Sequence, residues 1–429
     1  MSAPTRREVL RALALAAAGL GVGTACGHGT ADDALSGSEL VASTVPRAVA
    51  DPAARPEAVR AVQALGTDIF RRLAANNGNL VCSPYCVALA LAMTRNGAVG
   101  HTADEMDHVL HVSALDRFNA GLNALALHIE GRAGAKRRND NTTATIALDS
   151  ANSLWGQRDS TWVPAFLDTL ARDYGTGLRL VDFKTDAAAA RRAVNAWTGN
   201  QTQGRITELV PAGVLTTLTR LVLVNALYLK APWEYPFHKE FTKPASFTRT
   251  DGSRVTADLM HTTMFAGYAE GPGWRAVDLP YAGRELAMAL VLPDEGRLSE
   301  VEKGVDAATV FARFTTAHLD VGLPRWTFRS QLRMDDVLRE LGMRTAFDQV
   351  AADFSGMTTQ EHLFVRAVLH EGFIAVNEEG TEAAAAAAVV TEAASMPRAV
   401  VFDRPFLFVI HDVATGTPLF IGRVADPKA

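Results

Sequence analysis

Apolar residues recur along the chain with helical spacing in three places. After Pro56, which suits a first helical turn, apolar residues follow one another three or four positions apart. They are Val59, Val62, Leu65, Ile69 and Leu73. A second apolar helix is expected directly after Ser83-Pro84, and residues 334–347 predict an amphipathic helix that stops at Gly342.

Other segments are continuously apolar and rich in β-branched residues, as buried strands are. Residues 220–233, "RLVLVNALYLKAPW", predict such a strand, and residues 284–296 predict a strand that ends in a turn. Residues 404–424 predict a hairpin with Gly416 in its turn. Helices and strands mix without an internal repeat or a regular βαβ order, so we expect one large α+β domain.

The N-terminal segment predicts export. Residues 1–25 carry paired arginines followed by an uncharged run of 14 residues, Ala12 to Ala25. A membrane span needs about 20 residues, so the run suits an export signal instead. The segment "RREVLR" resembles a twin-arginine signal, and "GTAC" resembles a lipoprotein cleavage box with Cys26 as the lipidated residue. We expect an exported protein, either extracellular or anchored by Cys26 on the outer face of the cell membrane.

Residues 26–56 are small, polar and punctuated by proline, which predicts a flexible tether. Order is expected to begin near Pro56, with a single domain over residues 57–429. The net charge is −5, and loss of residues 1–25, with three arginines and one glutamate, leaves −7. This acidic balance argues against nucleic acid as a partner. The basic cluster Lys136-Arg137-Arg138 is expected in a solvated loop, with a polyanion site as the alternative.

Motifs of enzyme chemistry are absent from the sequence. It contains no P-loop and no G-x-S-x-G nucleophile elbow, and Ile374 stands where an H-E-x-x-H motif would need its second histidine. No metal or cofactor is therefore expected. His370 is interpreted as a hydrogen-bonded core residue rather than a ligand. Cys82 and Cys86 are either two buried hydrophobic residues or a disulfide that closes a small loop.

The segment "EEGTEAAAAAAVVTEAASMPR", residues 378–398, has no place in this scheme. Alanine favours a helix, so a plain surface helix is one interpretation. In an extended chain, alternate residues would form one face without charge or bulk. That face holds Thr381, Ala383, Ala385, Ala387, Val389 and Thr391. No proline interrupts residues 381–396, so such a segment could also join a sheet as an interior strand.

Several segments, in the same order along the chain, resemble the serpin family. "NLVCSPYCVALALAM" begins at Asn79, "NAWTGNQTQGRI" at Asn195 and "NALYLKAPWEYPF" at Asn225, with Leu229 at a position where the family has phenylalanine. "LPYAGRELAMALVLPDEG", "LGMRTAF", "ADFSGM" and "RPFLFVI" follow, and "VNEEGTEAAAAAAV" resembles the hinge of a reactive-centre loop. Each segment alone is a weak signal, but their order makes the resemblance specific. It extends over nearly all of residues 58–427.

The resemblance implies a fold with three β-sheets, eight or nine helices and an exposed reactive-centre loop at about residues 378–402. The implied hinge consists of Glu378, Glu379, Gly380, Thr381, Glu382, Ala383, Ala384, Ala385 and Ala386. Its glycine, threonine and alanines match the inhibitory type. Counting from the hinge, and back from "RPF", places the reactive bond at Ala394–Ser395.

The implied activity is inhibition of serine proteases, not catalysis. The protease serine would attack the carbonyl of Ala394, and the freed loop would insert into the main sheet with the acyl-enzyme attached. Alanine at this position suits an elastase-like or subtilisin-like enzyme, whereas Met396 or Arg398 would suit chymotrypsin-like or trypsin-like targets. A monomer is expected. The alternatives are a non-inhibitory binding protein of the same fold, an inhibitor of a cysteine protease, or an exported hydrolase or solute-binding lipoprotein.

Further positions match known regions of the family. Ser83, Asn225 and His370 match the "shutter", where strands part, and Trp233 matches the "breach", where insertion starts. Arg325 and Glu378 are expected to pair at the hinge. Two residues depart from the family pattern: Cys86 replaces a common shutter serine, and Glu371 replaces a usual lysine.

Overall fold

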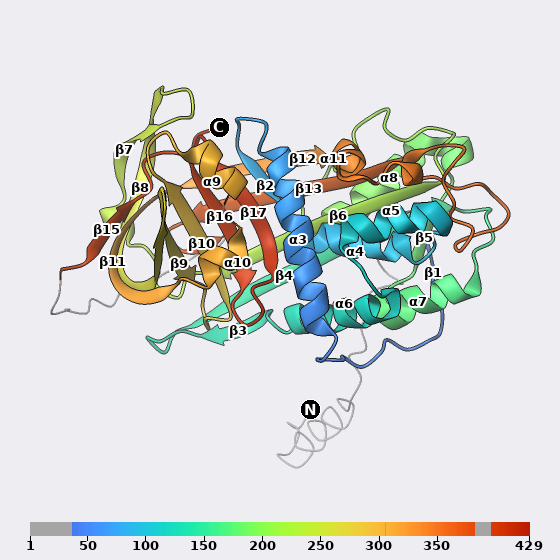
Figure 1. The fold of residues 1–429 in the computed structure, drawn as a ribbon, viewed down its shortest axis with the longest axis horizontal. Helices are drawn as coiled ribbons and strands as arrows, with labels where there is room; N and C mark the ends of the chain where they lie inside the picture. The colour runs from blue at the N-terminus through green and yellow to red at the C-terminus, as the bar shows by residue number, and fades with distance from the viewer. Residues whose placement is uncertain (1–36, 305, 382–395) are drawn as a thin grey trace, which may run out of the picture.

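The computed structural model describes residues 37–304, 306–381 and 396–429. Eight strands form the main sheet, in the order β1 (Glu39–Val41), β5 (Leu178–Val181), β4 (Thr143–Gln157), β6 (Leu221–Pro232), β14 (Gly380–Thr381), β13 (Ala367–Asn377) and β12 (Trp326–Arg333), with β3 (Gly134–Arg137) paired to β4. Figure 1 shows this sheet running along the long axis of the molecule.

Nine strands form the second sheet, which lies on the left in Figure 1. Their order is β15 (Arg398–Val401), β11 (Thr315–Pro324), β8 (Arg254–Gly271), β9 (Trp274–Pro280), β10 (Leu286–Pro293), β16 (Phe406–Asp412), β17 (Pro418–Val424) and β2 (Leu80–Cys82), with β7 (Lys243–Thr248) paired to β8. Sequence resemblance predicted three sheets. Hydrogen bonding joins the described strands into two, because the 18-residue strand β8 pairs with β7, β11 and β9.

Nine α-helices lie within the described ranges. They are α3 (Arg55–Leu73), α4 (Pro84–Arg95), α5 (Gly100–Leu110), α6 (Leu115–Glu130), α7 (Pro164–Tyr174), α8 (Phe183–Gln201), α9 (Leu298–Gly304), α10 (Ala307–Phe311) and α11 (Met334–Leu341); η1 (Lys239–Phe241) and η2 (Thr345–Phe347) are short 3₁₀ turns. The α+β class and the helix count are confirmed. So is the stop of α11 at Gly342, which adopts a left-handed conformation with φ of 118°.

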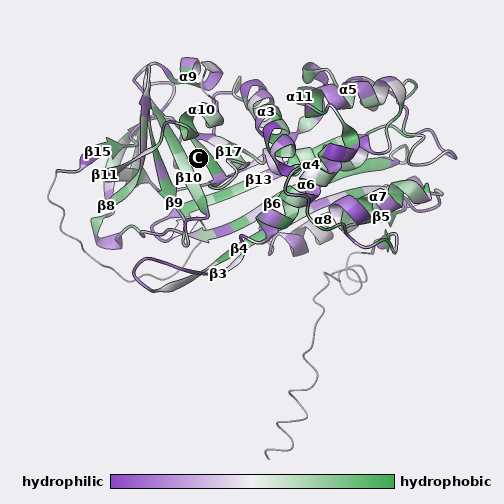
Figure 2. Cartoon of the chain, turned by 60° about the horizontal axis from the view of Figure 1, so that its bottom comes forward, coloured by the Kyte–Doolittle hydropathy of each residue, from purple (hydrophilic) through white to green (hydrophobic). Residues whose placement is uncertain are grey.

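The central strand β6 is buried on both faces, which explains its continuous apolar sequence. Leu221, Leu223 and Leu227 belong to the large core that also contains α3 and α4. Val222 and Val224 face a separate core built with α8. Figure 2 shows the sheets as mostly hydrophobic and the covering helices as mixed. We call these two surfaces of the main sheet the α4 face and the α8 face.

The predicted tether over residues 26–56 is wrong in its second half. Strand β1 pairs with β5, and the amide of Ala48 donates to the carbonyl of Arg172 at 2.8 Å. Arg47 contacts Asn123 at 2.9 Å and Glu130 at 2.9 Å. The composition of residues 26–56 did not reveal this ordered segment, because β1 is held in the sheet mainly by backbone hydrogen bonds.

The proposed export signal and Cys26 lie outside the described residues. In the described part of the chain, no helix has the length and apolar character of a membrane span.

Candidate functional site

The main sheet is opened between its two central strands at one end. β6 and β13 pair directly as parallel strands from Val222–Ala367 to Leu227–Gly372. Beyond that point β14 lies between them: Thr381 pairs with Ala231 on one side and with Val376 on the other. The first residues of the predicted loop are therefore already part of the sheet.

Gly380 is required where the chain enters this gap. Its φ is +149°, and an added Cβ would lie 2.3 Å from the carbonyl oxygen of Ala231 and 2.6 Å from the Cα of Pro232. Both atoms belong to the backbone, so a side chain could not be accommodated by a rotamer change. Thr381 follows with 3 % exposure on the α4 face, and its hydroxyl contacts the hydroxyl of Tyr281 at 2.7 Å.

Trp233 holds the chain just before the gap. Its backbone amide donates to the carbonyl of Glu379 at 2.8 Å, and its indole Nε1 donates to the carbonyl of Asn377 at 3.0 Å. The ring stacks on Tyr281, with centroids 4.6 Å apart and planes 3° from parallel. Trp233 is 1 % exposed, so these contacts fix the position of the hinge from within the core.

Two glutamates precede Gly380 in contrasting surroundings. Glu378 accepts hydrogen bonds from Arg325 (Nε, 2.8 Å) and from Thr242 (2.6 Å). Burial alone would raise the pKa of Glu378, but these hydrogen bonds outweigh it and hold the pKa below its ordinary value. The expected contact between Arg325 and Glu378 is present.

Glu379 is buried without equivalent contacts. Neither of its carboxylate oxygens has a hydrogen-bond partner among the described residues, and the Lys239 ammonium lies 3.6 Å away. A buried carboxylate without hydrogen bonds is destabilising by about 1–3 kcal/mol or more. The hinge is thus held by one satisfied carboxylate and weakened by the next.

Ser83, Asn225 and His370 form a buried cluster below the gap, each 0 % exposed. The amide of Ser83 donates to His370 Nε2 at 2.9 Å, so the ring proton is on Nδ1, which contacts Asn225 Oδ1. Asn225 Nδ2 has no hydrogen-bond partner among the described residues. Burial lowers the pKa of His370 to about 4, against a smaller opposite effect of the contact with Asn225. His370 is therefore neutral and hydrogen bonded in the core.

Cys86 lies beside this cluster, at the start of α4. Its amide donates to Ser83 Oγ at 3.2 Å, and its thiol is 3.9 Å from Ser150 Oγ and 3.8 Å from Asn152 Nδ2. Burial raises the pKa of the Cys86 thiol, although these contacts lower it in part. Cys82 and Cys86 are both free and buried, so the disulfide alternative is not realised in this structure.

Glu371 lies on the α8 face, opposite in direction to His370. It is 2 % exposed, and its Oε1 has no hydrogen-bond partner among the described residues. Burial raises the pKa of Glu371, and Arg329, whose Nη1 is 3.6 Å away, opposes this only in part. The departure from the family pattern thus places an incompletely satisfied carboxyl group on the strand that borders the gap.

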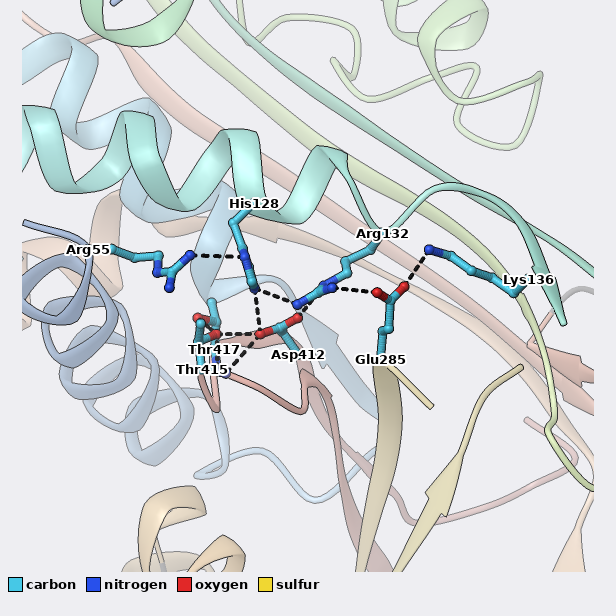
Figure 3. Close-up of polar contacts among 8 residues, drawn as sticks. All are labelled: Arg55, His128, Arg132, Lys136, Glu285, Asp412, Thr415 and Thr417. Carbon is cyan, nitrogen blue, oxygen red and sulfur yellow. Dashed lines mark hydrogen bonds and ion pairs between the residues drawn. The ribbon is translucent and has the colours of Figure 1, made fainter. Parts of the chain in front are cut away.

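The expectation of a solvated loop at Lys136-Arg137-Arg138 is wrong for Lys136 and Arg138, whereas Arg137 is exposed at the end of strand β3. Lys136 contacts Glu285, and Arg132 Nη1 donates to the same carboxylate at 2.8 Å (Figure 3). Arg138 is 8 % exposed, and its Nε donates to the carbonyl of Trp233 at 2.8 Å. Arg132 also donates to Asp412 at 2.6 Å. Internal carboxylates and a carbonyl thus bind Arg132, Lys136 and Arg138, and only Arg137 of the cluster is exposed, so the structure does not support a polyanion site.

Sequence reasoning missed three residues that contact the hinge region: Tyr281, Thr242 and Arg138. Tyr281 lies 100 positions before Thr381 in the chain, so only the fold reveals their contact.

The structure does not describe the remaining predicted site residues, which are Glu382, Ala383, Ala384, Ala385 and Ala386 of the hinge and the bond Ala394–Ser395. In the described part of the chain, no group of three or more His, Cys, Asp or Glu residues is arranged to hold a metal ion.

These features define a class: an α+β protein whose main sheet opens between two central strands around the buried hinge of a loop. A family model described as "Serpin (serine protease inhibitor)" matches residues 60–427. The chain therefore belongs to the serpin family, whose members are protease inhibitors rather than enzymes.

Named relatives and solved structures agree. An uncharacterized serpin-like protein of Thermococcus kodakarensis is 37 % identical over 379 residues, covering 86 % of each chain. The human leukocyte elastase inhibitor is 34 % identical, covering 84 % of this chain and 97 % of its own. The native structure of tengpin, a thermophilic serpin, has a TM-score of 0.77 at 26 % identity, covering 90 % of this chain and 97 % of its own. Uncleaved ovalbumin has a TM-score of 0.76 at 25 % identity, covering 86 % and 99 %.

The buried His370 predicts a pH dependence of stability. The unfolded chain protonates this side chain below pH 6.5, whereas the folded chain does so only below about 4. The unfolded state therefore binds more protons in this window, and the free energy of unfolding should fall as pH falls from 6.5 to 4, by up to about 3 kcal/mol.

Urea unfolding at pH 7.5 and 4.5 would measure the effect. His370→Gln should lose stability at pH 7.5 but show a smaller further loss at pH 4.5 than the wild type. The exposed His108 on α5 provides a control, because H108Q leaves the buried cluster around His370 intact and should keep the wild-type pH dependence. An equal pH dependence in H370Q and wild type would contradict the prediction.

Proposed function

We propose that this chain is a suicide-substrate inhibitor of serine proteases. The target cleaves Ala394–Ser395, and the freed segment inserts between β6 and β13 while the protease remains attached as an acyl ester of Ala394. The main observation behind the proposal is the position of β14, which already lies between β6 and β13 at the end of the gap formed by Ala231 and Val376.

The pairing of β14 sets the register of the inserted strand. Gly380 pairs with Pro232 and Thr381 with Ala231, so each further residue of the loop would meet the preceding residue of β6. Continued along the 12 residues of β6, this register brings Thr391 to Leu221 at the far end of the strand. The remaining three residues would place Ala394, with the attached protease, beyond that end.

The same register leads Ala387 directly between Asn225 and His370, which are now paired with each other. Insertion must break the contact of His370 with Asn225, and the incoming side chain would lie on the α4 face beside Ser83. The residue that passes between Asn225 and His370 must be small and apolar, and alanine is both. The alternation of uncharged residues in the loop thus fits the face that it would enter.

The uncleaved state should be kinetically rather than thermodynamically favoured. Glu379 and Asn225 both carry buried polar atoms without hydrogen bonds among the described residues. Each such group is destabilising by about 1–3 kcal/mol. Parting β6 from β13 would expose or rearrange both, and the new strand would supply hydrogen bonds to both neighbours.

Alanine at the reactive bond, preceded by Ala393, supports an elastase-like or subtilisin-like target. The human leukocyte elastase inhibitor is a relative at 34 % identity, which agrees with this choice. One alternative is a non-inhibitory binding protein of the same fold. Inhibition of a cysteine protease is a further alternative.

We also propose that the protein is an exported monomer, which is either extracellular or attached to the outer face of the cell membrane through Cys26.

A covalent complex separates inhibitor from non-inhibitor. Mixed with elastase, the wild type should give an SDS-stable band at the combined mass. Thr381→Arg should be cleaved without forming this band, because Thr381 is 3 % exposed between two strands and a guanidinium there opposes insertion. Thr381→Ser, which retains the hydroxyl that meets Tyr281, is the matched control. Complex formation by T381R at wild-type yield would rule out the insertion step.

The register predicts an ion pair between the inserted segment and β6. Glu382 would lie opposite Lys230 on the α8 face, and such cross-strand pairs contribute about 0.2–1 kcal/mol. In the cleaved protein, Lys230→Glu and Glu382→Lys should each lower the midpoint of guanidinium unfolding, and the double variant should recover most of the loss. Additive losses in the double variant would show that the strand enters in another register.

The reactive bond predicts a change of target. Ala394→Arg should lower the association rate constant with elastase by at least about 100-fold and raise that with trypsin, because the carbonyl donor enters the primary pocket of the protease. Met396→Arg is the comparison: it should leave the elastase preference in place. Trypsin inhibition unchanged by A394R would place the reactive bond elsewhere.

A further inference from the structure

A hollow lies where the chain rejoins the body after the proposed reactive bond. It has a volume of about 600 Å³, and its lining includes Tyr268, Glu270, Arg313, His318, Met396 and Arg398. Tyr268 and Glu270 lie near the end of β8, and Arg313 and His318 lie just before and within β11. Met396 precedes β15, and Arg398 is its first residue. Figure 1 shows these strands at the left end of the molecule, away from the helices that surround the main sheet.

The hollow is close to the proposed reactive bond along the chain. Met396 lies two residues and Arg398 four residues after Ala394, and four extended residues span about 13 Å. Arg398 is fixed to the body, because β15 pairs with β11 from Arg398–Leu319 onward. A protease of some 230 residues is roughly 40 Å across. Any such enzyme with the bond in its active site must therefore cover this end of the molecule.

The side chains here resemble those of a protein interface. Met396 is 95 % exposed and Phe265 is 54 % exposed, although both are large and apolar. Phe265 pairs with His318 across β8 and β11, and the two rings stack with centroids 4.9 Å apart. The guanidinium of Arg398 lies 4.4 Å above the ring of Tyr268. Aromatic residues, methionine and arginine are the types enriched at protein–protein interfaces.

The charge of the hollow is positive on balance. Arg398 Nη1 lies 3.4 Å from the Glu270 carboxylate, so these two charges largely offset each other. Arg313 is exposed, and among the described residues no carboxylate lies within ion-pair distance of it; its Nη1 donates to the carbonyl of Glu270 at 3.4 Å. The Arg313 guanidinium, which also lies 5.9 Å from the centre of the Trp274 ring, therefore has no internal carboxylate partner among the described residues and can bind a carboxylate of a partner protein.

We propose that this surface, with Phe265 and Arg313 as its main contacts, is a second docking site for the target protease. This proposal rests on the proposed inhibitory function. The surface would select among proteases of the same primary specificity, which the residue at the reactive bond cannot do. Phe265 supplies apolar contact to any protease seated on the loop. Arg313 favours enzymes with carboxylates on the side where the leaving chain emerges, and it acts chiefly on the rate of association.

The test compares two elastase-type proteases of equal primary specificity, one acidic and one basic by isoelectric point. Arg313→Glu should lower the association rate constant about three- to tenfold for the acidic enzyme and leave it unchanged or higher for the basic one. The difference should shrink as salt rises from about 0.02 to 0.5 M. Phe265→Ala should lower the rate constant for both enzymes.

Matched controls are Arg60→Glu, an exposed arginine on α3, and Leu218→Ala, a 64 % exposed leucine outside the hollow. A synthetic peptide of residues 388–400 measures what the loop contributes alone, and its cleavage rate should not predict the order of the two enzymes. Wild-type complex formation with equal rates for R313E, F265A and controls would overturn the docking site alone. Absence of any SDS-stable wild-type complex would instead overturn the proposed inhibitory function.

Discussion

The structure depends on incomplete pairing between two strands. β6 and β13 are hydrogen bonded along their first part and separated beyond it by two residues, Gly380 and Thr381. A fully paired sheet would bury its polar groups better, but it would offer no entry. The opening is maintained by Trp233 and Tyr281 on the α4 face and by the contact of Glu378 with Arg325 at its rim. Fold, hinge and proposed activity all rest on this one departure from regular pairing.

Buried polar groups mark the path along which the strands would part. His370 is neutral, paired with Asn225 and capped by Ser83, whereas Glu371 on the next position points to the opposite face with an unsatisfied oxygen. The hydrogen bonds of His370 favour the closed sheet, whereas the unsatisfied atoms of Asn225 and Glu371 limit its stability. The two strands that would part are therefore held together by a hydrogen-bonded cluster and weakened by unsatisfied groups beside it.

Much of the fold could be predicted from the sequence, because helices and buried strands impose their own periods. β6 was predictable since both its faces are apolar, and α11 since Gly342 ends it in a left-handed conformation. The hinge was predictable only through family resemblance. The contact of Thr381 with Tyr281 was not, because it joins residues 100 positions apart. β1 could not be predicted from the sequence, because an edge strand of three residues is held by backbone hydrogen bonds and needs no apolar pattern.

The place of β15, β16 and β17 has a consequence for the fate of a cut molecule. Scission at the proposed bond would divide the polypeptide into two chains, the shorter comprising residues 395–429. β16 and β17 are interior strands of the second sheet, and their side chains are nearly all buried. The short chain would therefore remain non-covalently associated, and only a denaturant would release it. A protein cut at this bond would thus be a tight non-covalent heterodimer of its own two fragments.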